Sequence, residues 1–493
     1  MPRSRILRAL ALLPVAFGVL AIPSPEEQVP QAPPRARSFA WNRDSLWQAL
    51  EQRFDAVRAR GCADTLATAA ELSRLDGVVA QLGDTRLAPD AGVLDTLEAS
   101  YFAVAPQVAA CAALVPRYVQ LHLHLREAVK AQSITWDVNG TPARDRLYRA
   151  LYGGRAAVEE VMLQQPGAVT PLVTSGITDR IAASATPSAV SNGVTLHSGD
   201  MLVSRGGAPT SALIARGNDY PGNVSHVALV HVDSATHAVS VIEAHIEAGV
   251  AVASADKYLA DKKLRVLVLR PRTDLQALRR DPMLPHRAAS AALARARREH
   301  IPYDFAMDYT DPSRLFCSEV ASSAYRTQGV TLWSGISTIS RPGLRHWLSA
   351  FGVQHFATQE PSDLEYDPQL HVVAEWHDAA TLFKDHVDNA VTDAMLDEAD
   401  RGQSLTYAWY MLPLARVMKA YSAMRVMLGG HGPVPEGMSA TAALRNRAYG
   451  AAHRARADAL HAAVTSWRQG IEHGHPPTYW TLVRLAGGDT TPR

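Results

Sequence analysis

The first long patterned stretch of the chain has the three-to-four spacing of apolar residues that is typical of helices. This spacing runs from about residue 39 to residue 165, with helices expected to begin near Ser45 and to cover 63–82, 93–113 and 116–132. No catalytic constellation falls in this region. We therefore predict a helical region over 39–165 that acts as a structural scaffold, with a cap over a neighbouring site as the alternative.

Near Gly167 the pattern changes to short alternations rich in β-branched residues, which indicate strands. A hairpin is expected where two such stretches flank the turn-like Asp233–Thr236. A helix follows further on, over 285–299. The expected strands cover 169–173, 194–204, 225–232, 237–244 and 264–270.

The last third of the chain returns to a helical pattern after a possible edge strand at 371–376. Helices are expected over 379–427 and again up to about Gly470, separated by a Gly- and Pro-rich break. An acidic loop at 358–368 is expected to be solvated surface, or alternatively to border a cleft. An apolar cluster is expected in the core, comprising Tyr407, Trp409, Tyr410, Met411 and Leu414.

These patterns predict an α+β protein with helical regions on both sides of a mixed domain. We place the helical regions at 39–165 and 377–485, the mixed domain at 166–376 and a flexible tail at 486–493. A chain of 493 residues is long enough for two or three domains.

The N-terminus has the pattern of an export signal. Arg3, Arg5 and Arg8 precede an apolar run over 9–22, which suits a signal h-region better than a membrane span. We predict that 1–22 is a signal peptide or an uncleaved anchor and that 23–38 is a Pro-rich linker. The protein is then exported, periplasmic or membrane-anchored facing the periplasm, with possible proximity to the membrane through this segment.

The net charge of +1 gives no broad electrostatic case for a nucleic-acid partner. The 19 histidines are scattered and show no HExxH spacing. We therefore expect no nucleic acid, no metal and no cofactor.

The chain has three cysteines, so at least one of them has no disulfide partner within an exported chain. Cys62 and Cys111 both fall in the first helical region, where a disulfide between them is possible but not required by the sequence. Cys317 is then the thiol left over, and an unpaired thiol in an oxidising compartment is a liability unless it is protected or used.

Cys317 stands where a loop becomes a helix. Val320, Ala321, Ala324 and Tyr325 recur at the spacing of a buried helix face, so the helix should begin close to Cys317. Unpaired amides at a helix N-terminus favour the thiolate, and we expect the thiol pKa to be lowered. The alternative is a small buried cysteine in a core helix.

The predicted hairpin carries a histidine and a glutamate. If the loop is Asp233–Thr236, Val232 faces His237 and His226 lies directly opposite Glu243. A carboxylate beside an imidazole can orient the ring and stabilise its charged form. A polar pair at a sheet end is the alternative, and a register slip of one residue would send the side chains to opposite faces.

Several fragments, in this order, resemble the circularly permuted papain-like amidases, the YaeF/YiiX-like relatives of the NlpC/P60 hydrolases. The resemblance covers roughly residues 190–330, and in the permuted group the histidine precedes the cysteine, as it does here. The fragments are Leu196–Leu202, Ser225–Ala228, Ile242–Ala244, Tyr303–Asp304 and Phe316–Val320.

The resemblance implies a role for each matching residue. Cys317 would be the nucleophile, His226 the general base and Glu243 the residue that holds the imidazole. Tyr303 resembles the tyrosine that such amidases place near the nucleophile. Ser318 is a tentative oxyanion or substrate residue that could instead shape the helix cap.

His245 and Glu247 compete with Glu243 for the orienting role, because alternation puts all three on one face if the strand runs on. The cross-strand register favours Glu243.

The expected function is that of a cysteine hydrolase that cleaves an amide in a peptide, cell-wall or lipid-linked substrate. Ester or thioester cleavage or acyl transfer by the same triad is an alternative, and so is a non-catalytic module that uses the same cleft for binding. A zinc site built from Cys317, His226 and His245 is a weaker third hypothesis.

Overall fold

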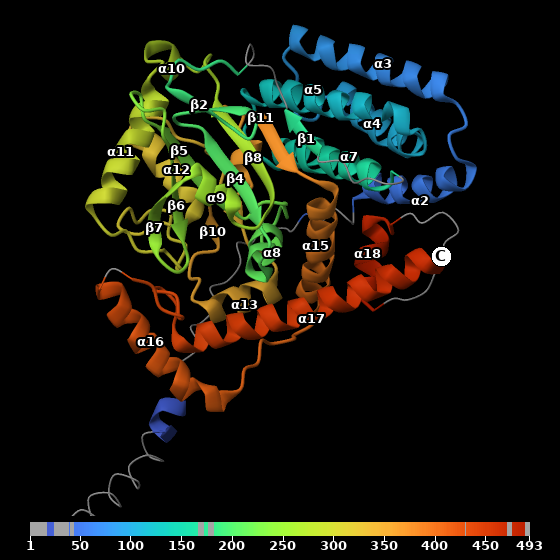
Figure 1. Cartoon of the computed structure of the whole chain (residues 1–493). Helices are drawn as coiled ribbons and strands as arrows, with labels where there is room; N and C mark the ends of the chain where they lie inside the picture. Colours follow the sequence, from blue (N-terminus) through green and yellow to red (C-terminus); the bar gives the residue numbers. More distant parts are fainter. Residues whose placement is uncertain are drawn as a thin grey trace, which may run out of the picture.

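A computed structural model describes residues 17–23, 39, 44–165, 172–175, 182–428, 430–470 and 476–488. It shows a mixed α and β protein in which helices lie on both sides of an antiparallel sheet (Figure 1). The predicted α+β class is therefore confirmed.

The described residues of the N-terminal region form helices joined by short loops, and all four predicted helices are present. The long helices are α2 (Ser45–Arg60), α3 (Thr65–Gln81), α4 (Gly92–Ala110) and α5 (Val115–Ser133). Asp64 caps α3 by accepting a hydrogen bond from the amide of Ala67 at 2.8 Å. The region ends with α6 (Thr141–Leu147), a π-helical turn η4 (Tyr148–Gly153) and α7 (Gly154–Leu163).

A disulfide joins Cys62 to Cys111, which confirms the pairing that the sequence left open. Cys62 precedes α3 and Cys111 follows α4, so the bond ties the α2–α3 connection to the end of α4. Cys317 is the free thiol.

The central sheet has seven strands in the order β1-β11-β8-β4-β5-β6-β7. All neighbouring strands are antiparallel. The strands are β1 (Leu172–Ser175), β4 (Met201–Gly206), β5 (His226–Val232), β6 (Val239–His245), β7 (Gly249–Ser254), β8 (Lys263–Pro271) and β11 (Leu370–His377).

The predicted edge strand at 371–376 is an inner strand, so that prediction was wrong. It lies within β11, which pairs with β8 on one side and with β1 on the other. The sequence signal for an edge failed because β1 joins the sheet from nearly 200 residues earlier in the chain. The predicted strand at 169–173 falls partly outside the described residues.

Two further two-stranded antiparallel sheets occur among the described residues. They are the hairpin of β2 (Ser188–Ser191) with β3 (Val194–His197), and β9 (Ser337–Thr338) with β10 (Ala357–Thr358), which are connected through a helix. The remaining helices of this part are α8 (Pro209–Arg216), α9 (Ala255–Ala260), α10 (Gln276–Arg280), α11 (Leu284–Arg298), α12 (Cys317–Arg326), α13 (Pro342–Phe351) and α14 (Asp363–Tyr366). Helices α11 and α12 both contact β5 and β6, so they cover the sheet where the hairpin lies.

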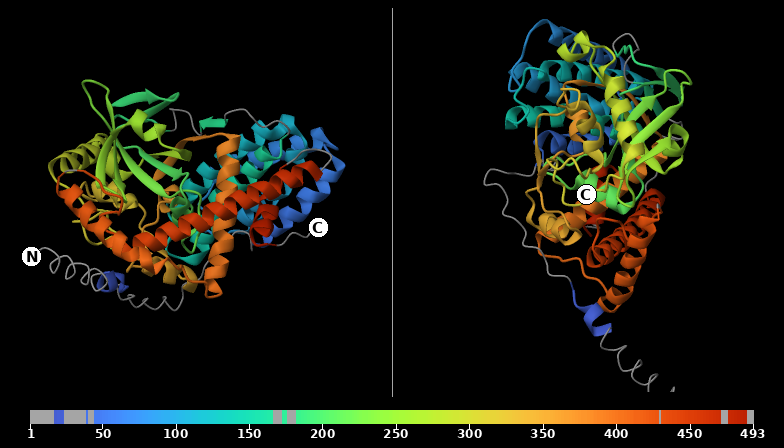
Figure 2. Two further views of the ribbon diagram at one scale, coloured as in Figure 1. Left: turned by 60° about the horizontal axis from the view of Figure 1, so that its bottom comes forward. Right: turned by 90° about the vertical axis from the view of Figure 1, so that its left-hand side faces the viewer.

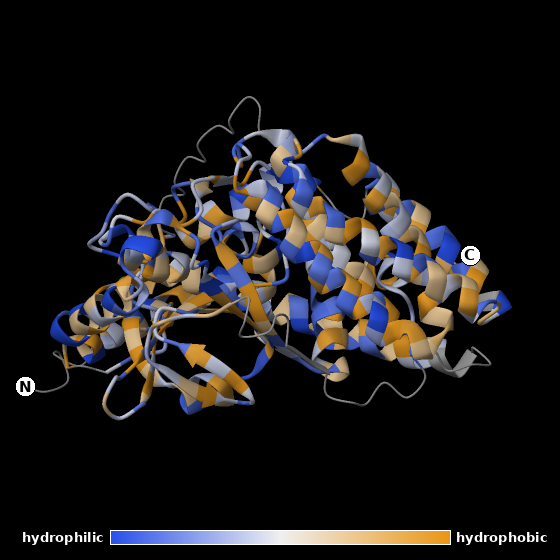
Figure 3. Ribbon diagram, turned by 90° about the horizontal axis from the view of Figure 1, so that it is seen from above, coloured by the Kyte–Doolittle hydropathy of each residue, from blue (hydrophilic) through white to orange (hydrophobic). Residues whose placement is uncertain are grey.

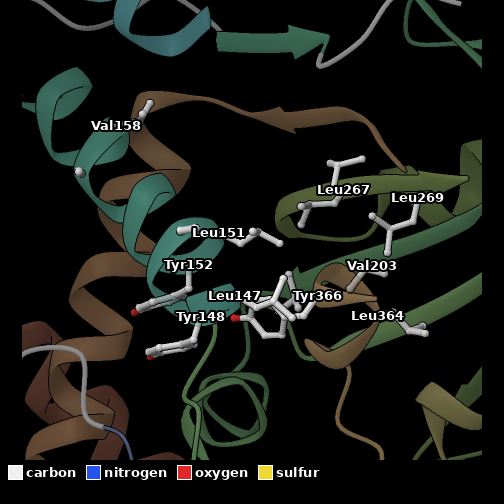
Figure 4. Packing of buried hydrophobic residues seen from close by; sticks show 14 of the residues in the cluster. Leu147, Tyr148, Leu151, Tyr152, Val158, Val203, Leu267, Leu269, Leu364 and Tyr366 are labelled. Atoms are coloured by element: carbon white, nitrogen blue, oxygen red, sulfur yellow. The ribbon is translucent and has the colours of Figure 1, made fainter. Parts of the chain in front are cut away.

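Both faces of the sheet are buried, and alternating residues along its strands belong to two different hydrophobic clusters, one on each face. Val203, Leu267 and Leu269 belong to the large cluster that also contains the N-terminal helices. Figure 4 shows these side chains near Leu147 and Leu151 of the N-terminal helices. Leu202, Val266 and Val268 belong to a second cluster on the opposite face.

A buried group of ion pairs also fastens both helical regions to the sheet. Arg265 of β8 binds Asp385 of α15 (Ala379–Asp400) at 2.7 Å and Glu159 of α7 at 3.0 Å. All three side chains are at most 3% exposed. Removing one member of such a group would leave an uncompensated buried charge.

The C-terminal region contains α15, the 3-10 turn η5 (Trp409–Met411), α16 (Leu412–Met427), α17 (Ala440–Gly470) and α18 (Tyr479–Ala486). Trp480 of α18 stacks on Trp47 of α2 with ring centroids 4.2 Å apart, so the two helical regions touch. Figure 3 shows hydrophobic and hydrophilic residues side by side on these helices, as expected for helices with one packed face.

The predicted core position of the aromatic cluster near residue 409 was wrong. Trp409 and Tyr410 are each 60% exposed and Leu414 is 53% exposed. The turn η5, which holds Trp409 and Tyr410, leads into α16, and α16 runs along the outside of the molecule (Figure 2). No helix among the described residues is long and apolar enough to cross a membrane.

Candidate active site

The imidazole of His226 and the carboxylate of Glu243 meet on one face of the β5–β6 hairpin. His226 Nε2 lies 2.7 Å from Glu243 Oε2. The predicted direct pairing of these residues was wrong, because Glu243 lies opposite Ala228. The shift from the predicted register is two residues, which keeps both side chains on the same face and lets them meet diagonally.

The turn explains the difference in register. The last pair of the hairpin is Val232 with Val239, so the loop is two residues longer than predicted. The carboxylate of Asp233 accepts hydrogen bonds from the amides of Ala235 and Thr236 at 3.1 and 2.8 Å. His237 has a φ of 58°, which closes the loop through a left-handed residue.

Glu243 holds a second histidine as well. Its Oε1 lies 3.1 Å from Nε2 of His245, whose side chain is 41% exposed. Glu243 itself is buried, and these two hydrogen bonds lower its pKa despite the cost of burial. The ionised carboxylate therefore accepts from both rings. Strand β6 ends at His245, so Glu247 does not continue it.

The imidazole of His226 has its other nitrogen free. Among the described residues no hydrogen-bond partner faces Nδ1, while Nε2 is bound to Glu243. Burial lowers the pKa of His226, although the hydrogen bond to Glu243 acts in the opposite direction. The neutral ring with its proton on Nε2 is therefore favoured, and Nδ1 can act as a base.

Cys317 is the first residue of α12, as predicted. Glu319 fixes this start by accepting a hydrogen bond from the amide of Phe316 at 3.1 Å. The sulfur lies 3.7 Å from the carbonyl oxygen of Ser225, and the amide of Val227 donates to it. The two residues on either side of His226 therefore both contact the thiol.

The described residues show no hydrogen bond between the sulfur and the imidazole, because the thiol points at the Ser225 carbonyl. The expected lowering of the thiol pKa was wrong. Burial raises the pKa of Cys317 to about 12, against the opposing effect of the amides of Val227, Ser318 and Cys317 itself. Desolvation outweighs the helix N-terminus because the thiol is only 4% exposed.

Tyr303 lies close to the nucleophile candidate. Its segment runs beside the residues that precede α12 through a bridge between Tyr303 and Leu315. Burial and the neighbouring Cys317 raise the pKa of the Tyr303 hydroxyl well above its usual value. The phenol therefore stays protonated and can donate a hydrogen bond.

The hydroxyl of Ser318 is already used within the fold. Ser318 Oγ donates to the carbonyl of Gln359 at 2.6 Å and is fully buried. Its backbone amide, by contrast, faces the Cys317 sulfur.

The acidic loop at 358–368 is largely buried beside α12, so its predicted place on the solvated surface was wrong. Gln359 accepts hydrogen bonds from Ser318 and Ser322. Glu360 is 3% exposed, its Oε1 has no hydrogen-bond partner, and it interacts electrostatically with Cys317. Burial raises the pKa of Glu360 well above its usual value, so this carboxyl can remain protonated.

Sequence reasoning missed Glu360. A single glutamate in a turn-rich stretch gives no periodic signal, and only the packing of the loop on α12 brings it near the thiol.

The two histidines of the hypothetical zinc site lie near each other, with ring centroids 5.9 Å apart, but both are bound to a carboxylate. Nε2 of His226 and Nε2 of His245 are both bound to Glu243. Within the described part of the chain, no group of three or more histidines, cysteines and acidic residues has an arrangement that could hold a metal ion.

Comparison with known proteins places this site within a known family domain. No curated protein matches this chain in sequence. One similar solved structure is that of metalloprotein yiiX from Escherichia coli O157:H7, with 18% identity over 35% of this chain and 93% of that chain, at a TM-score of 0.29. The predicted resemblance is confirmed for residues 195–374, which match the family of permuted papain-like amidase enzymes of the YaeF/YiiX type.

Proposed function

We propose that this protein is a cysteine hydrolase that cleaves an amide through an acyl-enzyme on Cys317, with the circularly permuted order of its family. His226 is the base and Glu243 orients it. The main support is that both neighbours of His226 contact the Cys317 sulfur while its Nε2 is held at 2.7 Å by Glu243. This placement supports a triad of nucleophile, base and orienting group.

In the first half-reaction the thiol turns from the Ser225 carbonyl and transfers its proton to Nδ1 of His226. The sulfur attacks the carbonyl carbon of the amide as this proton leaves. Because burial raises the pKa of Cys317 and lowers that of His226, the resting pair is neutral and the proton moves only when substrate is attacked. Glu243 stabilises the imidazolium that forms.

The oxygen that gains negative charge is met by the backbone amide of Cys317 at the start of α12. The protonated phenol of Tyr303 is a candidate second donor. The imidazolium then protonates the leaving amine, and the carbon–nitrogen bond breaks to leave a thioester on Cys317. In the second half-reaction His226 takes a proton from water, and the hydroxide attacks the thioester carbonyl. The carbon–sulfur bond breaks, the acid is released, and the imidazolium returns the proton to the Cys317 sulfur.

The substrate we propose is a peptide, cell-wall or lipid-linked amide outside the cytoplasm. This follows from the predicted export signal and from the amidase family matched by residues 195–374. Esters and thioesters undergo the same acyl transfer with better leaving groups, so they are suitable first probes of the site.

The test is acylation by an activated ester, followed by acid quenching and intact mass spectrometry. We expect one acyl group on Cys317 and none in Cys317→Ala. His226→Ala should slow acylation by roughly a hundredfold or more, as for loss of a general base. His231→Ala is the matched control, because His231 lies on the same strand but contacts His286 instead.

Acylation of Cys317 at the wild-type rate in His226→Ala would reject the mechanism. A protein that binds amides or peptides but never becomes acylated would be a non-catalytic binding module instead.

A further inference from the structure

The exposed face of α16 carries a continuous apolar stripe that the hydrolase does not use. Its residues recur at alternating spacings of four and three, which places them on one side of a helix. Their exposed fractions range from 41% to 77%. The stripe consists of Tyr410 in η5, of Leu414, Val417, Tyr421 and Met424 in α16, and of Leu428 just after α16.

The opposite side of α16 is the side that packs on the protein. Leu412 and Ala415 form a small cluster with Ala440 at the start of α17, separate from the two large cores. Buried Ser422 accepts a hydrogen bond from the amide of Val434 at 3.0 Å. The helix is therefore fixed by one face, and the stripe points outward. Contiguous exposed apolar patches often mark interaction sites.

Residues 17–22, at the N-terminal end of the described chain, pack beside this same helix. Residues 17–21 are helical, and they lie beside the start of α16 in all three views (Figures 1 and 2). Arg416 donates hydrogen bonds to the carbonyls of Val19 and Leu20 at 3.1 and 3.0 Å. The ring of Phe17 meets Trp409 edge-on with centroids 6.3 Å apart.

These N-terminal residues enlarge the apolar surface instead of covering it. Phe17, Val19 and Ile22 are 43%, 59% and 61% exposed. Residues 17–22, which end the apolar run predicted to be a signal or anchor, thus lie beside the stripe. Both segments expose apolar side chains to solvent.

The charged residues within the sequence that forms the stripe are all basic. No aspartate or glutamate occurs between Arg401 and Pro435, and Arg416 and Arg425 lie on α16 itself. Lys419 is held on the packed side of the helix, where it donates to the carbonyls of Pro435 and Glu436. Two copies joined through this face would bring uncompensated positive charges together. An apolar face with aromatic residues and nearby cations instead fits the surface of a bilayer that contains acidic phospholipids.

We propose that η5 and α16, together with residues 17–22, form a membrane-docking surface that lies flat in the headgroup region of an acidic bilayer. The tryptophan and tyrosines sit at the level where such rings are favoured, and Arg425 reaches the phosphates. This inference does not depend on the proposed hydrolase activity.

The test places an environment-sensitive fluorophore on the stripe of the full-length chain. Met424→Cys in a Cys317→Ala background gives one labelling site, because Cys62 and Cys111 are joined in a disulfide. With vesicles of phosphatidylcholine and phosphatidylglycerol we expect a blue shift and quenching by quencher-bearing lipids. The same label at Val190→Cys, an exposed apolar position on β2, should show neither change.

Two acidic substitutions on the stripe provide the matched comparison. Leu414→Glu with Val417→Glu should weaken partitioning of the labelled protein at least about tenfold. Leu66→Glu with Val190→Glu makes the same changes at exposed positions elsewhere and should leave it within about twofold. Thermal melting of each variant establishes that it is folded.

Unquenched label on Met424→Cys in the presence of vesicles would overturn the proposal. Equal partitioning of the two double variants would do the same. A stable dimer that buries the label without lipid would show that a second copy covers the stripe instead.

Discussion

Replacing Glu243 by Gln tests the part of the site that the structure defines best. The substitution keeps the shape of the side chain and removes its charge. In the native protein this buried carboxylate accepts from Nε2 of His226 at 2.7 Å and from Nε2 of His245 at 3.1 Å. The glutamine can still accept one hydrogen bond, but it no longer opposes the positive charge that forms on His226 during attack.

The size of the effect follows from the kind of hydrogen bond lost. A hydrogen bond to a charged group is worth about 1.5 to 3 kcal/mol, and a barrier increase of about 1.4 kcal/mol slows a reaction tenfold. Glu243→Gln should therefore slow acylation of Cys317 by roughly one to two orders of magnitude. The carboxylate is 4% exposed, so solvent screening does not reduce this estimate much.

The assay is the rate of acylation by an activated ester under single-turnover conditions. His245→Gln is the control, because it removes the other partner of Glu243 and leaves His226 held; its rate should stay within about threefold of wild type. If Glu243→Gln acylates as fast as wild type, or if His245→Gln is the slower variant, the assignment of the orienting role is wrong.

Two further predictions concern pH and stability. Burial lowers the pKa of His226 and the mechanism needs its neutral form, so the acylation rate should fall on the acid side with a midpoint below pH 6.5. Glu243→Gln should move this midpoint lower still. A midpoint above pH 6.5 would contradict the burial argument. Arg265→Leu should lower the free energy of unfolding by about 3 kcal/mol in urea titrations, at the lower end for breaking a buried pair. It removes the cation that Glu159 and Asp385 share, but these carboxylates still pair with Arg155 and Arg205. Arg295→Leu breaks an exposed ion pair and should lower the free energy of unfolding by less than about 1 kcal/mol. If both variants lost the same free energy of unfolding, the buried ion pairs would not be the cause of the Arg265→Leu loss.

Periodic features of the sequence predicted the structure well. The helices near Ser45 and over 63–82, 93–113 and 116–132 are all present, and α12 begins at Cys317 as expected. Each of these follows from local spacing and from local start signals, which act over a few residues. The shared face of His226 and Glu243 was also predictable, since strand alternation is strict.

Features that depend on distant packing were not predictable in the same way. The thiol pKa rises because the protein closes over Cys317, and the spacing of a helix carries no measure of that burial. Glu360 reaches the site only because its loop packs on α12. The aromatic residues near Trp409 have the pattern of a core stripe, yet Trp409 and Tyr410 face outward. In the described part of the chain, residues 17–22 lie beside them without covering them.

The topology of the sheet has a consequence for the order in which the chain folds. The hairpin that carries His226 and Glu243 is made from contacts between near neighbours in sequence, so it can form while the chain is still being synthesised. Within the described residues β1 pairs with β11 alone, and β11 begins only at Leu370. Strand β1 therefore stays without a partner strand until translation has passed Cys317. The sheet is completed by β11 only after all the candidate catalytic residues have been synthesised.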